Sequence, residues 1–178
     1  MLANIVFISG GPGTGKTAVI NSLSKRGYEI LPEAAREIAE EKFSGKSIIE
    51  IDRKFFQDEI FRLQKILFDD SVRRGGIFFS DRGFGDTIAY YKINHLGVPK
   101  NVFEYAKKFN YARVFILEPL NFYKNDLLRQ ESKEEQEKIQ AEIVRAYKEL
   151  GNGIVGVPFM SVEKRTEFVL KNSGVPNL

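Results

Sequence analysis

A glycine-rich stretch near the start of the chain has the spacing of a phosphate-binding loop. Residues 7–17 read FISGGPGTGKT, in which Gly10 is followed after four residues by Gly15, Lys16 and Thr17. In this P-loop pattern backbone N–H groups face phosphate oxygens, the lysine bridges the β- and γ-phosphates, and the hydroxyl binds Mg²⁺. An apolar run precedes the stretch and a helix-like run follows it, as the pattern requires. The residues that we expect to hold a nucleoside triphosphate are Gly10, Gly11, Pro12, Gly13, Thr14, Gly15, Lys16, Thr17 and Ala18.

An acid and an arginine follow a later apolar run, in IFFSDRGFGD at 77–86. An acid at the end of a strand beside a P-loop steadies Mg²⁺, and an arginine there can hold an oxyanion through two parallel hydrogen bonds. We therefore predict Asp81, together with Thr17, as the metal ligands and Arg82 as a phosphate contact. Ser80 interrupts the apolar run just before the acid, and a turn aspartate followed by a solvent-facing arginine would give the same residues.

The pair Asp81–Arg82 also bears on the kind of reaction. An ATP-driven machine of the AAA type normally has Asp-Glu at this point, where the glutamate activates water, and this chain has no second acid there. A GTPase would carry Asn-Lys-x-Asp after its fourth strand, whereas VFILE is followed here by PLNFYKND. Transfer of the γ-phosphate from ATP to a second substrate is therefore favoured over a motor or a switch.

Two further segments offer charged residues for such a transfer. Glu33 follows the second apolar run, and Arg36 lies one turn later on the same helix face. Glu33 could accept a proton from the acceptor hydroxyl or align that hydroxyl, and Arg36 could hold an anionic group of the acceptor. An acid favoured by the helix dipole and an exposed arginine explain the same two residues equally well. Arg129, in NDLLRQESKEEQEK, could be the cation of a lid over about 119–135 that closes on the nucleotide, or an ordinary surface arginine.

The elements that must position these residues alternate along the chain. Nearly continuous apolar runs, typical of parallel strands covered on both faces, occupy 3–8, 28–31, 77–80, 112–117 and 154–157. Helix-like stretches between and after them cover 16–25, 33–43, about 48–73, 132 onward and 162–172, with a short helix near 101. The expected caps are Ser47 with Glu50, Asn101 with Glu104, Ser132 with Glu135, Ser161, and Asp86 for a helix that begins near Thr87. This order predicts an α/β doubly wound sheet.

Length and composition limit the number of domains, the metal sites and the partners that the chain can have. A chain of 178 residues fits one domain, over 1–178, and no repeat or linker divides it. With no Cys and a single His, His95, a structural zinc site is not expected, and we assign no site role to His95, Tyr90 or Tyr91. The 27 Lys and Arg are interleaved with 24 Asp and Glu, so we expect no nucleic-acid partner. The start MLANIVFISGG resembles neither a signal peptide nor a membrane span, so we expect a cytoplasmic protein, and the oligomeric state stays open.

Five segments in this order resemble a known superfamily. GGPGTGKT, LPEAARE, FFSDRGFGD, NDLLRQES and VGVP, spread over nearly the whole chain, are similar to the P-loop nucleoside and nucleotide kinases. Within these, the chain looks most like the kinase domain of the ribosylnicotinamide kinase type from NAD metabolism. The P-loop is highly specific for nucleotide binding, and the E-x-x-R and D-R-G motifs are moderately specific for this subgroup.

The resemblance implies a three-layer fold with a five-stranded parallel sheet in the order 2-3-1-4-5, helices on both faces and a helical lid. It also implies Mg²⁺–ATP-dependent phosphorylation of a small hydroxyl-bearing, nucleoside-like acceptor. The resemblance implies catalytic roles for Lys16, Glu33, Asp81, Arg82 and Arg129. It also implies that the acceptor is bound by Glu33, Arg36 and Arg82. The alternative is a regulatory module that binds or slowly hydrolyses the triphosphate and recognises an anionic partner such as a phospholipid head group.

Overall fold

A five-stranded parallel sheet forms the centre of the computed structural model, which describes residues 4–43, 52–109, 112–119 and 132–176. The strands are β1 (Asn4–Ser9), β2 (Glu29–Leu31), β3 (Ile77–Asp81), β4 (Arg113–Leu117) and β5 (Gly153–Val157). Their order across the sheet is β2-β3-β1-β4-β5, and every neighbouring pair is parallel. The α/β fold class and the strand order 2-3-1-4-5 are thereby confirmed.

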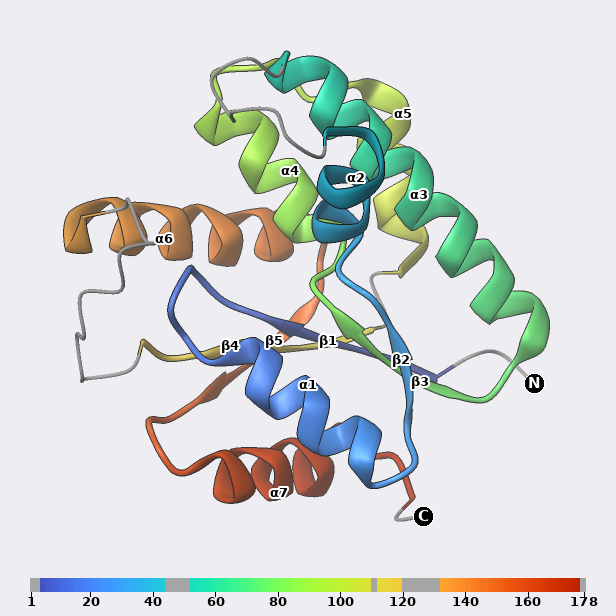
Figure 1. Cartoon of the computed structure of the whole chain (residues 1–178), viewed down its shortest axis with the longest axis vertical. Coiled ribbons are helices and arrows are strands. Elements are labelled where there is room, and N and C mark those ends of the chain that lie inside the picture. The colour runs from blue at the N-terminus through green and yellow to red at the C-terminus, as the bar shows by residue number, and fades with distance from the viewer. Residues whose placement is uncertain (1–3, 44–51, 110–111, 120–131, 177–178) are drawn as a thin grey trace.

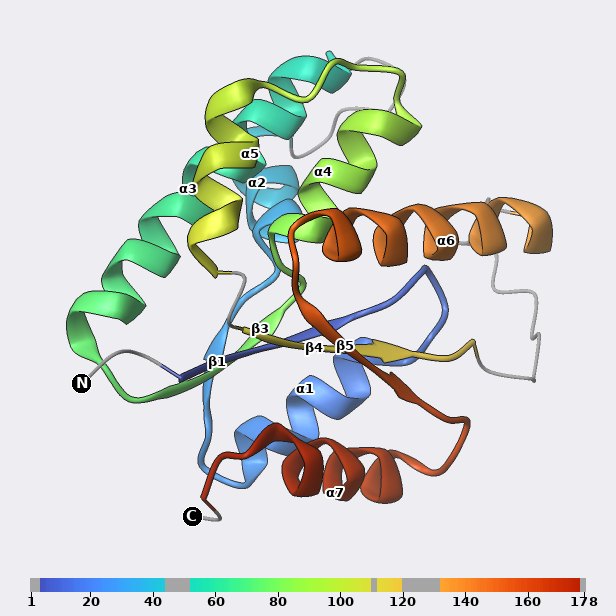
Figure 2. The same ribbon diagram turned by 180° about the vertical axis from the view of Figure 1, so that it is seen from behind.

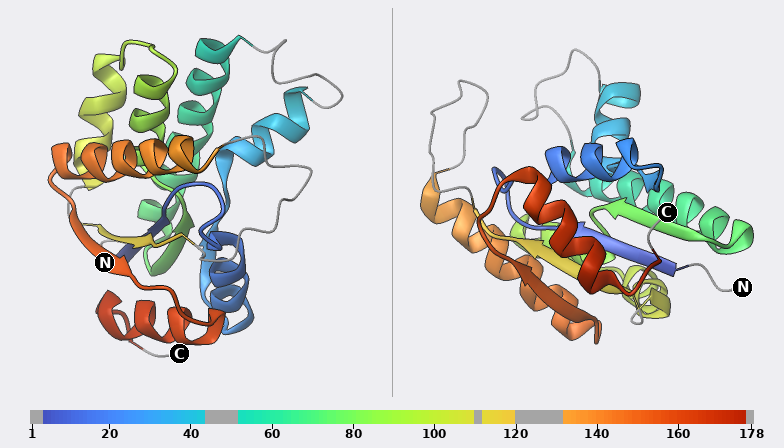
Figure 3. Two further views of the ribbon diagram at one scale, coloured as in Figure 1. Left: turned by 90° about the vertical axis from the view of Figure 1, so that its left-hand side faces the viewer. Right: turned by 90° about the horizontal axis from the view of Figure 1, so that it is seen from below.

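Helices cover both faces of this sheet and make three layers (Figures 1 and 2). One face carries α1 (Lys16–Lys25) and α7 (Val162–Ser173). The other carries α3 (Arg53–Arg74), α4 (Phe84–Ile93), α5 (Lys100–Ala106) with a 3₁₀ turn (Lys107–Phe109), and α6 (Lys133–Glu149). The short α2 (Ala34–Phe43) packs against α3, to one side of the sheet (Figure 3).

The central strand shows why the apolar runs are continuous. Successive side chains of a strand point to opposite faces, so Ile5 and Phe7 enter the core beneath α3 to α6, while Val6 and Ile8 enter the core against α1 and α7. All four side chains are buried. Because both faces of the sheet are covered, apolar and polar residues do not alternate in β1. The P-loop follows directly after the carboxyl end of this strand.

Two of the expected helix caps are present. Ser132 and Glu135 form a capping box in which each side chain accepts a hydrogen bond from the other's backbone N–H. Ser161 accepts from the N–H of Lys164 at the start of α7. The long helix α3, by contrast, begins at Arg53 rather than near 48, because the carboxylate of Asp52 accepts from Phe55 N at 2.8 Å. Ser47 and Glu50 lie outside the described residues.

Two other predicted caps are wrong. α5 begins at Lys100 after Pro99, so Asn101 lies inside its first turn. α4 begins at Phe84, directly after an extended Gly83, so Asp86 is the third residue of the helix and not the residue before it. Asp86 nevertheless satisfies the helix start, since its carboxylate accepts the Gly83 N–H at 3.1 Å. Over the part of the chain that the structure describes, no helix combines the length and apolar character needed to cross a bilayer.

Candidate active site

The P-loop joins β1 to α1 at the carboxyl edge of the sheet. Gly10 has φ +138°, and a Cβ there would lie 2.9 Å from the carbonyl oxygen of Leu117, so both the conformation and the space require glycine. The buried Lys16 ammonium donates to the carbonyl oxygens of Gly10 at 2.9 Å and Gly11 at 2.8 Å. Thr17 is exposed in the first turn of α1. The loop is therefore held in shape by its own lysine.

Asp81 ends β3 beside this loop, in a buried position. Its Oδ1 atom is buried and accepts no hydrogen bond from the described residues. Burial and the neighbouring Glu33 carboxylate raise the pKa of Asp81 to about 6, although Arg82 and Lys16 act in the opposite direction. A buried carboxylate oxygen without a donor is a site for a cation or for water bound to one.

Arg82 follows in a conformation that non-glycine residues rarely adopt, with φ 72°. The turn is held by two hydrogen bonds, from Arg82 N to Ile8 O at 3.0 Å and from Ser80 Oγ to Arg82 O at 2.6 Å. Ser80, which broke the apolar run in the sequence, thus fixes the backbone of the arginine. Such a strained backbone conformation persists only where the surrounding structure imposes it. At Arg82 it directs the side chain across the carboxyl edge of the sheet.

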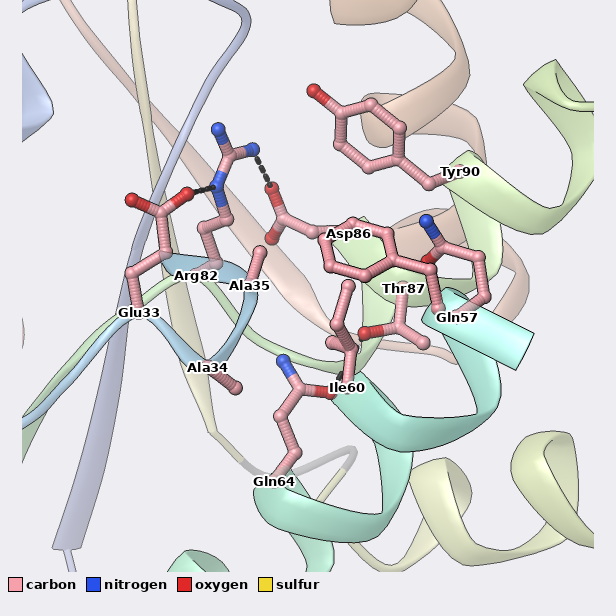
Figure 4. Close-up of a pocket in the computed structure, with 11 residues that line it drawn as sticks. Glu33, Ala34, Ala35, Gln57, Ile60, Gln64, Arg82, Asp86, Thr87 and Tyr90 are labelled. Atoms are coloured by element: carbon pink, nitrogen blue, oxygen red, sulfur yellow. Dashed lines mark hydrogen bonds and ion pairs between the residues drawn. The ribbon is translucent and has the colours of Figure 1, made fainter. Parts of the chain in front are cut away.

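The guanidinium of Arg82 lies between two carboxylates (Figure 4). Its Nε donates to Glu33 Oε1 at 2.6 Å, and its Nη1 donates to Asp86 Oδ1 at 3.3 Å. The Tyr90 ring lies 5.6 Å from the guanidinium carbon. Burial alone would raise the pKa of Glu33, but Arg82, Lys16 and Arg36 hold it below its ordinary value. Glu33 is therefore ionised at neutral pH.

Arg36 takes a different position from its partner. Its Nη2 lies 4.0 Å from Glu33 Oε2, yet its side chain is 59% exposed. Arg36 therefore adds to the positive field around Glu33 without entering the pocket described below.

Asp86 joins these groups to the P-loop strand. Its Oδ1 also accepts from Ser9 Oγ at 2.7 Å, and its Oδ2 accepts from Tyr147 Oη at 2.6 Å. Ser9 is the residue immediately before Gly10. The charges of Glu33, Asp81, Arg82 and Asp86 all act on Lys16, whose pKa burial, followed by Arg82, lowers to about 8. These five side chains form one electrostatic cluster.

A cavity of about 230 Å³ opens from this cluster between α2, α3 and α4 (Figure 4). Its charged end is formed by Glu33, Arg82 and Asp86. The rest is lined by apolar side chains and neutral polar ones: Ala34, Ala35, Phe56, Gln57, Ile60, Gln64, Thr87 and Tyr90. Thr87 Oγ1 donates to Gln64 Oε1 at 2.6 Å, which turns the amide N–H₂ of Gln64 away from α4. A small molecule bound here would have one end beside the amides of Gln57 and Gln64 and the other beside Arg82.

A second buried arginine supports the P-loop from the opposite face of the sheet. Arg165 of α7 is 2% exposed and donates from Nη1 to Thr14 O at 2.6 Å, from Nη2 to Glu118 O at 3.0 Å and from Nε to Pro158 O at 3.1 Å. Its guanidinium therefore ties the P-loop to the ends of β4 and β5 through three backbone carbonyls.

Sequence reasoning had not selected Asp86, Tyr90, Tyr147 or Arg165 for the site. The i, i+4 spacing of Arg82 and Asp86 was the one available signal for the first of these. Tyr147 shares a helical spacing with the apolar residues Ile139, Ile143 and Leu150, which is typical of a core position, and no sequence signal marks Tyr90. Arg129 lies outside the described residues, as does most of the predicted lid, at 120–131.

The residues present fit a Mg²⁺ ion carried with a nucleotide. Among the described residues no three His, Cys, Asp or Glu side chains gather as a metal cage. Mg²⁺ characteristically keeps several waters and takes only one or two protein ligands beside the phosphates. The buried oxygen of Asp81 and the exposed hydroxyl of Thr17, both beside the P-loop, match that requirement.

Comparison with solved structures shows that several kinases and NadR share this fold. NadR in complex with NR superposes with a TM-score of 0.67 at 21% identity, over 99% of this chain and 53% of that one. A NadR structure with NAD and AMP-PNP gives a TM-score of 0.66 at 21% identity, over 98% of this chain and 51% of that one. Thymidylate kinase from Ehrlichia chaffeensis gives 0.65 at 14% identity, over 96% and 98%. Deoxyadenosine kinase from M. mycoides gives 0.60 at 17% identity, over 94% and 97%. The chain thus spans about half the length of NadR. At these identities the likeness shows the fold.

No curated protein matches the chain. A family model does match, over residues 5–165, and the family is described as an AAA domain. The match runs from β1 to the first turn of α7 and so includes the P-loop, Asp81 and Arg165. The position after Asp81 holds Arg82, not the water-activating acid of an AAA motor. Because the family model matches most of the chain, the chain belongs to this AAA domain family.

Proposed function

We propose that this protein is a Mg²⁺–ATP-dependent kinase that phosphorylates a hydroxyl of a small nucleoside-like molecule. The observation that carries the proposal is the cavity that opens beside the P-loop, with Glu33 and Arg82 at the junction. A hydroxyl bound at that junction would lie between the acceptor pocket and the phosphates held by Lys16 and Thr17. The AMP-PNP named for NadR supports ATP as the donor, and the NR and deoxyadenosine named for two of the similar structures support a nucleoside-like acceptor.

The division of roles follows from the positions of the side chains. Phosphoryl transfer requires mainly alignment and neutralisation of charge, and Mg²⁺ supplies positive charge at the β- and γ-phosphates. Lys16 would exchange the carbonyl oxygens of its own loop for phosphate oxygens. Asp81 would accept hydrogen bonds from water on the metal. Glu33, ionised and anchored through Oε1 to Arg82, would orient the acceptor hydroxyl with its second oxygen.

The charge of the pocket indicates which acceptors it admits. Among the described lining residues, the carboxylates of Glu33 and Asp86 face the single guanidinium of Arg82, so the balance is one negative charge. A phosphorylated acceptor would bring further negative charge to this end, whereas a neutral or positively charged nucleoside would not. We therefore propose an unphosphorylated acceptor, and we assign Arg36 to the support of Glu33 rather than to an anionic group of the acceptor. The role of Arg129 as a lid cation remains a prediction from the sequence.

The proposal is tested by incubating the protein with Mg²⁺–ATP and a panel of nucleosides, cationic ribosides and nucleoside 5′-monophosphates, and measuring ADP. We expect ADP release that depends on an unphosphorylated acceptor. Glu33→Gln should lower turnover by about 10²–10⁴-fold without changing ATP affinity, because its carboxylate contacts the acceptor hydroxyl. Glu37→Gln, an exposed acid one residue beyond Arg36, is the matched control and should leave turnover unchanged.

Other outcomes would move the protein to a different class. Slow ATP hydrolysis that no acceptor accelerates would favour the regulatory module that recognises an anionic partner. Wild-type turnover in Glu33→Gln, with the same acceptors, would remove Glu33 from the transfer step.

A further inference from the structure

α6 contacts the P-loop and the acceptor site through two side chains. It lies across one face of the sheet, beside the P-loop turn along part of its length and beside α4 near its C-terminal end (Figures 1 and 2). Gln140 and Tyr147 are seven residues apart, which is two helical turns or about 10 Å along the axis, and they therefore lie on the same side of the helix.

Gln140 holds the first turn of the P-loop. Its side-chain oxygen accepts the N–H of Gly11, and its amide nitrogen donates to Leu117 O at 3.1 Å. A Cβ at Gly11 would lie 3.1 Å from that oxygen and 3.3 Å from the carbonyl oxygen of Gln136. The P-loop therefore rests directly on α6, with one carboxamide joining it to the end of β4.

Tyr147 holds the acceptor side. Its fully buried ring fits against Gly85, where a Cβ would lie 2.5 Å from ring atoms. From this position its hydroxyl donates to Asp86 Oδ2, and the other oxygen of Asp86 accepts from Ser9 and from Arg82. Burial and the Asp86 carboxylate raise the pKa of Tyr147 well above its ordinary value, so the phenol remains a donor.

The hydrogen bond from Tyr147 to Asp86 affects the reaction because Asp86 and Glu33 compete for Arg82. Arg82 is shared between Asp86 and Glu33, and the carboxylate of Asp86 is partly neutralised by the Tyr147 hydroxyl, the Ser9 hydroxyl and the Gly83 N–H. If the phenol is removed, Asp86 carries more uncompensated charge and attracts Arg82 more strongly, away from Glu33. The alignment of Glu33 and the phosphate contact of Arg82 would both change.

We infer that α6 is the element that fixes the P-loop relative to the acceptor site, and that Tyr147 is a positioning residue that acts through Asp86 on Arg82. The inference rests on the proposed kinase activity and adds to it two residues with separable effects. Gln140 affects the nucleotide and Tyr147 affects the transfer step.

The experiment compares Tyr147→Phe, Gln140→Met and the wild type in ATP titration and in acceptor-dependent turnover. Tyr147→Phe keeps the ring, and should lower kcat about tenfold with ATP affinity within about twofold, the scale of one hydrogen bond to a charged group. Gln140→Met should weaken ATP binding by several-fold with a smaller change in kcat. Tyr105→Phe is the control, because its hydroxyl also donates to an aspartate, Asp69, at 2.6 Å but away from the site. It should change stability alone.

Each result decides between a positioning role and a structural one. Wild-type kcat in Tyr147→Phe, or a loss of kcat in Tyr105→Phe of the same size, would overturn the inference while leaving the kinase proposal intact. Equal losses of kcat and ATP affinity in both α6 variants would reduce α6 to a packing helix and would overturn it as well. A wild-type protein that phosphorylates no acceptor would overturn the proposed function, and this inference with it.

Discussion

Replacement of Asp81 by asparagine should stabilise the free protein while weakening its use of Mg²⁺. The carboxylate is buried, has one oxygen without a donor among the described residues, and is ionised in the fold only above a pKa of about 6. Asparagine has nearly the same shape and no charge to bury. The wild-type residue therefore costs stability that the variant does not lose.

The size of the effect follows from the raised pKa. The ordinary pKa of the group is 3.8, and raising it to about 6 corresponds to about 3 kcal/mol, at about 1.36 kcal/mol for each pH unit. Below pH 3.8 the carboxyl is protonated in both the folded and the unfolded protein, so wild type and variant should be similar. As the pH rises to 6 the unfolded chain releases the proton first, and the stability of the wild type falls relative to the variant. The full difference is present above pH 6.

Urea unfolding of both proteins from pH 4 to 8, without Mg²⁺ or nucleotide, measures this difference. For a chain of this length about 3 kcal/mol corresponds to roughly 6–12 °C in Tm. Asp69→Asn is a control of opposite sign, since Lys65 and Tyr105 lower the pKa of Asp69 through hydrogen bonds. A variant that is less stable than wild type at pH 8, or a difference independent of pH, would refute the account of Asp81 as an unpaired buried charge. An unchanged Mg²⁺ requirement for activity would remove it from the metal site.

Three further substitutions test other parts of the site. Lys16→Ala should lose most Mg²⁺–ATP affinity in calorimetric titration while the protein stays folded, because the hydrogen bonds lost are those within the P-loop and burial makes the charge of Lys16 costly in the free protein. Wild-type ATP affinity would contradict the P-loop assignment. Gly85→Ala should destabilise the protein by about 1–3 kcal/mol through overlap with the Tyr147 ring. Gly97→Ala is the control, because no atom lies within 4 Å of a Cβ at that position. Equal urea midpoints for the two variants would show that α4 and α6 can move apart at no cost in stability. Arg165→Met should cost about 2 kcal/mol and weaken ATP binding, because the buried carbonyl of Thr14 and the partly buried carbonyls of Pro158 and Glu118 lose their donor. Unchanged ATP affinity would show that the P-loop keeps its shape without Arg165.

The sheet could be predicted because its signals are local. Each strand contains a short, mostly apolar run, and the glycine-rich turn marks the point where β1 ends and α1 follows. The strand order came from the resemblance to P-loop kinases, since the apolar runs themselves carry no information about which strand lies beside which. Helix starts were less accurate. The residues that precede α3, α4 and α5 are Asp52, Gly83 and Pro99. Near each of these helix starts the sequence also has another polar residue of a type that commonly caps helices.

The site shows the same limit. Lys16, Asp81 and Arg82 follow strand ends at recognisable spacings, and the fold brings them together with Glu33. The contact of Tyr147 with Asp86 spans 61 residues, and that of Arg165 with Thr14 spans 151. A tyrosine in an apolar stripe and an arginine in a charged helix give no sign in the sequence of such distant partners, because burial and geometry alone distinguish them from ordinary residues.

The arginine under the P-loop also sets when the nucleotide site can be completed during synthesis. The loop is made among the first residues of the chain, but the donor to its Thr14 carbonyl belongs to α7, 151 residues later. At roughly 5–20 residues per second, the ribosome needs about 8–30 s to add that stretch. During this interval the loop lacks its support, and so do the ends of β4 and β5 that the same guanidinium joins. A nucleotide that binds the P-loop would therefore meet the fully supported loop only after α7 has been made.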